Sequence, residues 1–340
     1  MRLIRPSYEI IEQQPGIQGI YDIIERCGKT SYKSEVKGGE DAKRFVDTRA
    51  KEMHGAVLEF GTVYLKIESP NWLAINKVYS WDDSDTIVFY KGNSHSRVNE
   101  HGNYVYITTN YRVLVENNRL DDLKYLCEPT EYHEKRYCVK FITDIGVGRE
   151  FLRHRVMSMV QESTRYVNYS KEKFGNECTF VIPPWIDIPE CEHLAYRDGD
   201  WVDAQNMKLI HEDKPGRVST WLWAMDYAEK AYRVLTNDWS DNDAFSEEEK
   251  KPWLAQQARG VLPLATKTEF VLCGFKDAWI HFFRLRSDIA ATGKPHPQAQ
   301  ELANPLRDEF IERQYITRED LDKASFTGFD VAITDTNLKD

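Results

Sequence analysis

Four cationic side chains stand in one short segment, EFLRHRVMSMVQESTRYVNYS. Arg153, His154 and Arg155 are consecutive, seven residues follow, and then come Ser163 and Arg165. A guanidinium keeps its proton, so an arginine in a partly apolar segment needs a carboxylate or another anion beside it. The planar fork of arginine and the hydroxyl of serine together suit a phosphate group. This segment therefore predicts a phosphate-binding site.

The same charges allow a second interpretation, in which the arginines form a solvated basic patch that pairs with Glu150 and Glu162. If a helix ends near Arg155, then Glu150, Arg153 and His154 are three and four residues apart and share one face. Charge by itself does not choose between the phosphate site and the patch.

The composition limits the classes of partner. The chain has 340 residues, a formal charge of -10 and a pI near 5.5, which argue against a general nucleic-acid surface or an anionic-membrane surface. It has neither an apolar run long enough to span a bilayer nor a signal-peptide pattern, and we expect a cytoplasmic protein. The six cysteines lack metal-ligand spacing, so no metal site is predicted and reduced, mostly buried thiols are expected.

Hydrophobic periodicity predicts a mixture of helices and strands that would position the motif. The predicted strands are 61–67, 86–90, 104–109, 136–145 and 266–275. The predicted helices are 41–53, 113–126, 148–155, 218–235, 277–289 and 304–313, with another running from the capping box at 246–249 to about 259. These elements favour an α+β fold.

Two nucleotide-binding patterns fail on their spacing. CGKTS resembles the end of a phosphate-binding P-loop, but Ile23 stands where the first glycine belongs, on a segment with a helical pattern. FITDIGVGREF resembles a dinucleotide-binding turn, but its third glycine position is Phe151. Neither pattern predicts a site.

The spacing of the arginine, serine and arginine-tyrosine residues resembles the signature of the flavin-dependent thymidylate synthases. Thr30-Ser31-Tyr32 resembles an early serine stretch of that family, and HGAVLEF, which begins at His54, resembles its histidine-to-glutamate stretch. ARGVLPLATKTEF and HFFRLR resemble its two later arginine blocks. The resemblance implies an antiparallel or mixed sheet flanked by helices. It implies one catalytic domain over 1–326, with an insertion at about 66–135 and a flexible tail at 327–340.

The resemblance also implies roles for individual residues. Arg286 would be the catalytic residue, lying against the uracil, where a fixed cation stabilises developing negative charge. The residues implied to bind dUMP are Glu150, Arg153, Ser163, Thr164, Arg165, Arg259 and Arg286. Those implied to bind FAD are Ser31, His54, Arg153, His154, Arg155, Gln161 and His281.

The implied reaction is the reductive methylation of dUMP to dTMP, with FAD as cofactor, methylenetetrahydrofolate as carbon donor and NADPH as reductant. The implied assembly is a homotetramer with sites shared between subunits, and neither nucleic acid nor a membrane is expected as a partner. Two alternatives stay open: another flavin- or nucleotide-dependent transferase, and a non-catalytic nucleotide-binding oligomeric protein.

The chain departs from the family pattern at three places. Glu150 stands where many members carry glutamine, and Val160-Gln161 replaces an Asn-Glu pair, so the polar flavin contact expected there rests on Gln161 or Glu162. Phe275-Lys276-Asp277 replaces the usual Asn-x-Arg, where Lys276 is a candidate for the missing charge. These departures predict that the flavin is held differently.

Overall fold

The computed structural model describes residues 1–68, 81–155, 157–169, 171, 177–237, 239–240, 244, 246–289 and 295–323. The chain divides into two compact units, Met1–Phe275 and Lys276–Asp340, which are described separately. The predicted tail at 327–340 lies outside the described residues.

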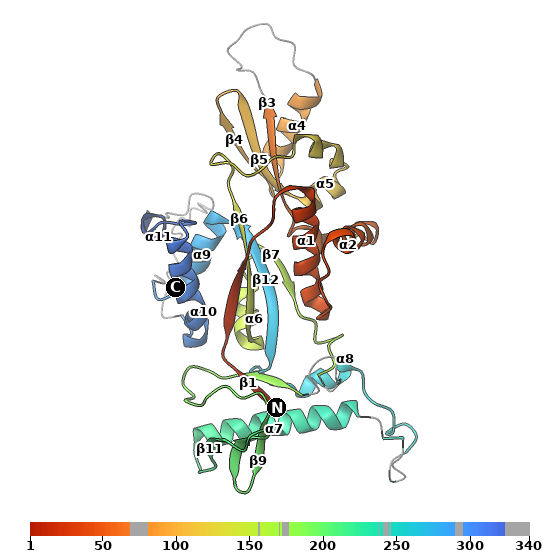
Figure 1. Ribbon diagram of the computed structural model, residues 1–340, viewed down its shortest axis with the longest axis vertical. Coiled ribbons are helices and arrows are strands. Elements are labelled where there is room, and N and C mark those ends of the chain that lie inside the picture. The colour runs from red at the N-terminus through yellow and green to blue at the C-terminus, as the bar shows by residue number, and fades with distance from the viewer. Residues whose placement is uncertain are drawn as a thin grey trace, which may run out of the picture. The chain divides into compact units, whose positions relative to one another are not determined.

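A four-stranded antiparallel sheet carries the motif in the first unit (Figure 1). Its order is β2-β6-β12-β7, and its strands are Ser7–Ile11, Arg136–Asp144, Lys267–Phe275 and Ser158–Gln161. The predicted strands 136–145 and 266–275 are confirmed as β6 and β12, which pair along their whole length. Phe141 of β6 stacks on Phe270 of β12 with ring centroids 5.2 Å apart, and such burial stabilises the pairing.

The segment before the second sheet is helical. It forms α1 (Gly16–Lys29), the short 3₁₀ helix η1 (Thr30–Tyr32), α2 (Gly39–Lys51) and α3 (Gly55–Leu58). Ile23 lies inside α1, as its helical pattern predicted, so CGKTS is the end of a helix and not a P-loop. η1 contacts both β7 and β12, which places the early serine stretch beside the motif.

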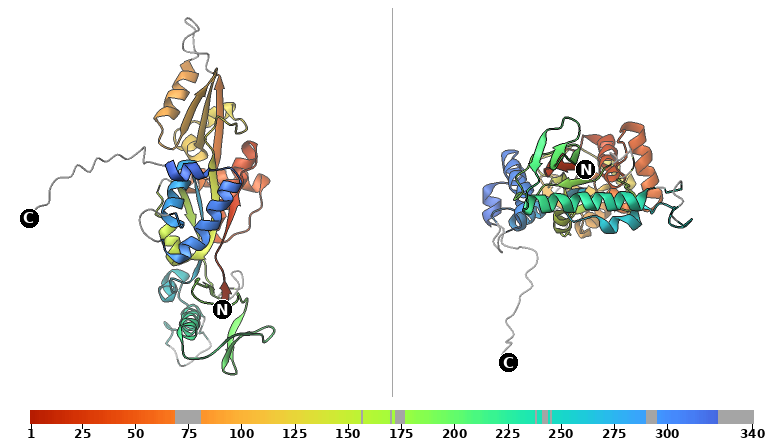
Figure 2. Two further views of the ribbon diagram at one scale, coloured as in Figure 1. Left: turned by 90° about the vertical axis from the view of Figure 1, so that its left-hand side faces the viewer. Right: turned by 90° about the horizontal axis from the view of Figure 1, so that it is seen from below.

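A three-stranded antiparallel sheet, β3-β5-β4, takes β4 and β5 from the predicted insertion, while β3 begins before it. Its strands are Thr62–Glu68, Tyr104–Asn110 and Arg97–His101, and it is accompanied by α4 (Trp81–Gly92), α5 (Tyr111–Glu116) and η2 (Leu120–Tyr125). Figure 2 shows α4 running alongside this sheet. The strand predicted at 86–90 is wrong, because these residues belong to α4, where Tyr90 is fully buried in the core. Packing in that core outweighs the local preference of TIVFY for a strand.

The rest of the first unit packs around a second core. Parallel β1 (Arg2–Ile4) and β8 (Thr179–Val181) form one small sheet, and β9 (Leu194–Arg197), β10 (Asp200–Asp203) and β11 (Leu209–Glu212) form another. The predicted helix 218–235 is confirmed as α7 (Arg217–Thr236). α7 buries Leu222, Met225 and Tyr232 in this core. Two short helices, α8 (Ala255–Ala258) and η4 (Arg259–Val261), contact α7 and lead toward β12.

Helices form the described part of the second unit: α9 (Lys276–Arg286), α10 (Pro297–Glu312) and α11 (Arg318–Lys323). Trp279 and Phe283 of α9 pack with Phe310 of α10, and Phe282 packs with Trp279. The last predicted helix therefore exists, but it begins at Pro297 and not at Asn304.

Three further helix predictions fail at their boundaries. The helix predicted at 113–126 is interrupted, because α5 ends at Glu116 and the 3₁₀ helix η2 covers Leu120–Tyr125. The helix predicted at 148–155 is α6, Ile145–Phe151, because Asp144 caps it three residues earlier than expected. Ser246 and Glu249 make the side-chain contacts of a capping box, but turns follow and only Ala255–Ala258 is helical.

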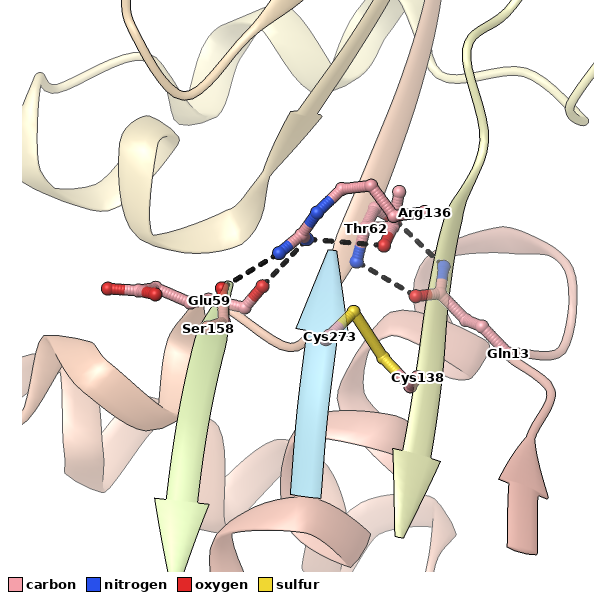
Figure 3. The surroundings of a disulfide bond; sticks show 7 residues. All are labelled: Gln13, Glu59, Thr62, Arg136, Cys138, Ser158 and Cys273. Carbon is pink, nitrogen blue, oxygen red and sulfur yellow. Dashed lines mark hydrogen bonds between the residues drawn. A yellow bond between two sulfur atoms is a disulfide. The ribbon is translucent and has the colours of Figure 1, made fainter. Parts of the chain in front are cut away.

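The prediction that the cysteines are reduced is wrong for one pair. Cys138 and Cys273 form a disulfide, while the other four cysteines are free. The two residues stand directly opposite each other in β6 and β12 although 135 residues separate them in the chain. Figure 3 shows the bond between the two strands. Sequence spacing cannot reveal a pair that only the strand register brings together.

The α+β prediction with antiparallel sheets and flanking helices is confirmed. The single domain over 1–326 with an insertion at about 66–135 stays a prediction. Within the part of the chain that the structure describes, no helix is both long and apolar enough to cross a bilayer. The same residues contain no group of three or more histidine, cysteine or acidic side chains arranged to hold a metal ion.

Candidate nucleotide site

The first half of the motif follows a short, firmly capped helix. Asp144 Oδ1 accepts a hydrogen bond of 2.8 Å from the Val147 amide, which satisfies one of the free donors at the start of α6. A Cβ added at Gly146 would lie 2.9 Å from this carboxylate, so glycine leaves room for the cap. α6 contacts β6 and β12, and this packing fixes where the motif begins.

The helix ends at Phe151, before the arginines. Arg153, His154 and Arg155 therefore lie in the turn after α6, and the prediction that Arg153 and His154 share a helix face with Glu150 is wrong. His154 is buried, whereas Arg153 and Arg155 are exposed and available to a ligand.

The second half of the motif leaves the edge of the central sheet. β7 pairs with β12, placing Gln161 opposite Phe270. The Gln161 side-chain amide donates to Thr268 Oγ1 at 3.0 Å. The next amide, of Glu162, donates to the Glu269 carbonyl at 2.7 Å. Backbone and side chain thus hold the start of the loop against β12.

The loop brings together residues that are far apart in sequence. The Ser163 amide donates to the Ser31 carbonyl at 3.1 Å, so the early serine stretch lies against the motif serine. Arg259 Nη1 donates to Thr164 Oγ1 at 3.3 Å. Arg165 is exposed, and its amide donates to Ser163 Oγ at 3.3 Å. Hydroxyls and guanidiniums therefore gather at one loop, which suits an oxyanion.

Glu162, within the same loop, has a different task. Its side chain is 1% exposed, and its carboxylate lies 2.8 Å from Lys267 Nζ and 3.6 Å from Lys33 Nζ. The Tyr169 hydroxyl donates to it at 3.1 Å. The pairing of Glu162 with the arginines in a solvated patch is therefore contradicted, while the pairing of Glu150 with them stays a prediction. Glu162 is also a poor flavin ligand, because its oxygens already have partners inside the protein.

Lys267 links Glu162 to a second carboxylate. It pairs with Glu269, which also lies 2.6 Å from Lys140 Nζ. Burial by itself would raise the pKa of Glu269, but Lys267 and Lys140 outweigh burial and lower that pKa to about 2. Burial would lower the pKa of Lys267, but Glu162 and Glu269 outweigh it and raise that pKa. Glu269 and Lys267 therefore both stay charged near neutral pH.

Arg136 anchors the start of β7, as Figure 3 shows. Its guanidinium donates to Ser158 Oγ at 2.9 Å, to the Glu59 carbonyl at 2.8 Å and to Thr62 Oγ1 at 3.3 Å. Arg136 belongs to β6, so one side chain joins the central sheet to the end of α3 and the start of β3. Burial lowers the pKa of Arg136 to about 10, which still leaves it protonated near neutral pH.

Sequence reasoning missed Arg136, Lys267 and Lys33 as residues that support the motif. Lys267 lies in the predicted strand 266–275, but its partner Glu162 is 105 residues away in the chain. The only sequence signal was a lysine in an otherwise largely apolar predicted strand.

The other predicted site residues occupy three places. His54 precedes α3 and contacts Arg49 and Glu52 at the end of α2, and it is exposed. Glu150 is half-buried on α6. His281 and Arg286 are half-buried on α9 in the second unit, which is described separately. Burial lowers the pKa of His281, and Arg284 and Arg286 lower it further.

The junction between β12 and α9 departs from the family pattern in structure as well as in sequence. Phe275 is 8% exposed, and the guanidinium carbon of Arg97 lies 4.8 Å from its ring centroid. Lys276, which sequence analysis treated as a candidate for the missing charge, lies 2.7 Å from Asp320. Its charge is therefore already paired within the second unit.

Comparison with solved structures gives distant matches. A UMP/dUMP methylase PolB from Streptomyces cacaoi, bound with 5-Br dUMP, is 13% identical with a TM-score of 0.37, covering 92% of this chain and 93% of that one. Thymidylate Synthase X from Helicobacter pylori with FAD and dUMP is 20% identical with a TM-score of 0.33, covering 62% of this chain and 80% of that one.

Sequence comparisons identify the family. A flavin-dependent thymidylate synthase from Mycobacterium avium (strain 104) is 28% identical over 168 residues, which are 48% of this chain. The match spans 55% of that relative, about half its length. The family model described as thymidylate synthase complementing protein matches residues 133–313, a range that contains Glu150 to Arg286 but neither Ser31 nor His54. Because this match covers more than half of the chain and confirms the resemblance of the motif, the chain belongs to the family of thymidylate synthase complementing proteins.

Proposed function

We propose that this protein is a flavin-dependent thymidylate synthase, which reductively methylates dUMP to dTMP with FAD as cofactor, methylenetetrahydrofolate as carbon donor and NADPH as reductant. The observation that carries the proposal is the loop at 163–165, which follows β7 and holds the hydroxyls of Ser163 and Thr164, the contact of Arg259 with Thr164 and the exposed Arg165. This loop binds the dUMP phosphate: Ser163 and Thr164 supply hydroxyls, and Arg165 and Arg259 supply charge.

The donors near the end of α6 fit a flavin dinucleotide. Arg153 and Arg155 are exposed, and their guanidiniums suit its pyrophosphate, while the half-buried Ser31 and Gln161 offer shorter polar contacts. His154, His54 and His281 complete the proposed flavin set. FAD, when bound, supplies the electron transfer that the side chains cannot. Phe275 is buried and offers no polar group, so we expect the flavin to be held differently from the way the usual Asn-x-Arg junction would hold it.

Arg286 is the proposed catalytic residue. It keeps its proton at any physiological pH, so it presents a permanent positive charge to the uracil ring. Negative charge develops on that ring during methylation, and a fixed cation stabilises it more than it stabilises the neutral ground state. Glu150 and Arg153 are proposed to orient the nucleotide.

The remaining elements of the proposal concern assembly and location. The protein works as a homotetramer in the cytoplasm, with sites shared between subunits, and it takes dUMP and folate as small-molecule partners without nucleic acid. Sharing between subunits is compatible with the exposure of Arg153, Arg155 and Arg165, which one subunit alone leaves open to solvent.

The test is an anaerobic reaction of the FAD-supplemented protein with NADPH, methylenetetrahydrofolate and dUMP, followed by measurement of dTMP. Product that depends on added FAD is the expected result. A folded, flavin-loaded protein that forms no dTMP would reject the proposal. Methylation of UMP but not dUMP would replace it with another nucleotide methyltransferase, and protein that takes up neither FAD nor dUMP would favour a non-catalytic scaffold.

Variants test the assigned roles. Arg286→Ala should abolish dTMP formation and leave the stability of the protein, measured without dUMP, unchanged. Arg165→Ala should weaken dUMP binding by about 2 kcal/mol, roughly thirtyfold, because a charged hydrogen bond to phosphate is lost. Arg44→Ala is the matched control, since Arg44 is an exposed arginine on α2 that pairs with Asp41 at 3.4 Å. Equal dUMP affinities in the two variants would remove Arg165 from the phosphate site.

A further inference from the structure

A small cavity of about 260 Å³ lies between the end of α1, η1 and the outer face of the central sheet. Its wall combines charged side chains with two hydroxyls. The lining residues with charge are Glu9, Arg26, Lys29, Lys33, Lys140 and Glu269, and the hydroxyls belong to Thr30 and Ser34. No residue assigned above to the nucleotide or the flavin lines it.

The charges around this cavity favour an anion. Arg26 pairs with Glu9 at 2.6 Å, Lys29 with Glu25 at 2.5 Å, and Lys140 with Glu269 at 2.6 Å. Arg26 and Lys29 therefore each have a carboxylate of their own, while Lys140 shares Glu269 with Lys267. The remaining carboxylate is Glu162, which Lys267 and Lys33 share. Five cations thus meet four carboxylates, which leaves one positive charge in excess within a chain whose formal charge is -10.

The excess charge belongs to Lys33. Lys267 lies 2.8 Å from Glu162 and is 6% exposed, whereas Lys33 lies 3.6 Å from the same carboxylate and its side chain is 26% exposed. Burial lowers the pKa of Lys33 and the charge of Lys267 lowers it further, against the opposing effect of Glu162. Lys33 is thus the cation with the weakest ion pair and with access to the cavity.

We propose that this cavity is an oxyanion-binding subsite in which Lys33 exchanges its long contact with Glu162 for a bound phosphate or carboxylate group. The flanking Thr30 and Ser34 hydroxyls supply hydrogen bonds, and Lys29 and Lys140 add attraction at longer range. Glu162 does not lose its partner when Lys33 moves, because Lys267 stays in place. Binding therefore leaves no buried carboxylate uncompensated.

The size of the cavity limits the ligand. Sites for drug-sized molecules occupy about 300–1,000 Å³, so this cavity suits a small anion or the anionic end of a longer molecule. The carboxylates Glu9 and Glu269 on its wall repel an anion, so the bound group should lie on the side of Lys33, Thr30 and Ser34. A phosphate, a pyrophosphate or a short polycarboxylate meets both conditions.

The subsite is separate from the proposed nucleotide site, although Ser31 lies between them in sequence and touches Ser163. Its anion is held by Lys33, while the dUMP phosphate is assigned to Arg165 and Arg259. The inference therefore stands whether or not the protein makes dTMP.

Calorimetric titration with pyrophosphate, and in a second arm with citrate, tests the proposal on the full chain without nucleotide. Lys33→Gln should weaken binding about tenfold or more, corresponding to about 1.4 kcal/mol. Lys33→Arg, which keeps the charge, should retain binding. Lys43→Gln is the matched control, because Lys43 is a half-exposed lysine on α2 that lies 3.8 Å from Asp47. Unchanged thermal unfolding of each variant establishes that it is folded.

Arg165→Ala separates this subsite from the nucleotide site. Pyrophosphate binding that survives Arg165→Ala and is lost in Lys33→Gln supports the proposal. Binding lost in Arg165→Ala but kept in Lys33→Gln would overturn it and place the anion at the motif loop, leaving the proposed function intact. Absence of binding to both probes in the unmodified protein also overturns it. Preference for pyrophosphate over citrate indicates a phosphate ligand, and the reverse preference indicates a polycarboxylate.

Discussion

At the scale of single residues, the motif divides its charges between two tasks. Arg153, Arg155 and Arg165 are exposed and available to anions, whereas Glu162 turns inward and pairs with Lys267. A buried ion pair is costly to form but still more costly to break, because the remaining charge is left without a partner. The ion pair of Glu162 therefore holds the loop against β12, and this contact fixes the position of the neighbouring Ser163.

The buried network predicts a dependence of stability on acid pH. The pKa of Glu269 is about 2 in the folded protein, below the ordinary 4.5. Its contribution to the free energy of unfolding is therefore complete above pH 4.5 and is lost as the pH falls toward 2, by about 3 kcal/mol in total. Urea unfolding from pH 6 to pH 2.5 should show that the stability difference between the unmodified protein and Glu269→Gln shrinks over this range.

The matched control for that experiment is Glu247→Gln, since the side chain of Glu247 is 89% exposed beside Lys250. Its effect should stay within about 0.5 kcal/mol at every pH. A stability difference for Glu269→Gln that is constant with pH would show that Glu269 titrates at its ordinary value.

Sequence reasoning found the residues of the motif but not their supports. Ser163, Thr164 and Arg259 could be grouped because a family resemblance spans them, and the structure places Thr164 and Arg259 in contact. Lys33 and Lys267 belong to no motif. Their importance comes from one shared carboxylate that strand pairing and loop packing bring within reach, and local periodicity carries no information about such a contact.

At the scale of elements, long strongly periodic segments were predictable and short ones were not. β6 and β12 follow their patterns because they are long and largely buried, and α7 follows its pattern because it packs Leu222, Met225 and Tyr232 into one core. α6 has only seven residues, and the Asp144 cap starts it three residues before the predicted start. The residues of TIVFY fit a strand by their local propensity, but they are helical in α4, and Tyr90 is buried in the core there.

The cap of α6 gives a prediction about the motif. Asp144→Ala should lower the free energy of unfolding by about 1 kcal/mol, because the Val147 amide loses its acceptor. It should also weaken dUMP binding, since α6 sets the start of the Arg153–Arg155 turn. Asp144→Asn, which keeps a side-chain acceptor, should retain much of the stability and much of the dUMP affinity. Asn110→Ala is the matched control, because Asn110 caps α5 through Val113 at 3.1 Å, away from the motif.

Chemical denaturation and calorimetric titration with dUMP measure the two effects. Asn110→Ala should reduce stability by a similar amount and leave dUMP affinity unchanged. Equal loss of dUMP affinity in Asp144→Ala and Asn110→Ala would mean that the affinity follows global stability and not the position of α6.

At the scale of the whole chain, the Cys138–Cys273 bond joins the two central strands across 135 residues of sequence. A crosslink restricts the unfolded chain, and for a loop of this length the chain-entropy estimate is about 5 kcal/mol, with about 2–5 kcal/mol usually measured. Protein purified without reductant and then unfolded should expose four reactive thiols, and six after reduction. The reduced form should unfold at a lower denaturant concentration.

Cys127→Ser is the matched control, because Cys127 is free. It should lower the thiol count by one, while reduction should still shift unfolding to a lower denaturant concentration. Six thiols before reduction, with no change in unfolding afterwards, would mean that β6 and β12 are held by hydrogen bonds and packing alone.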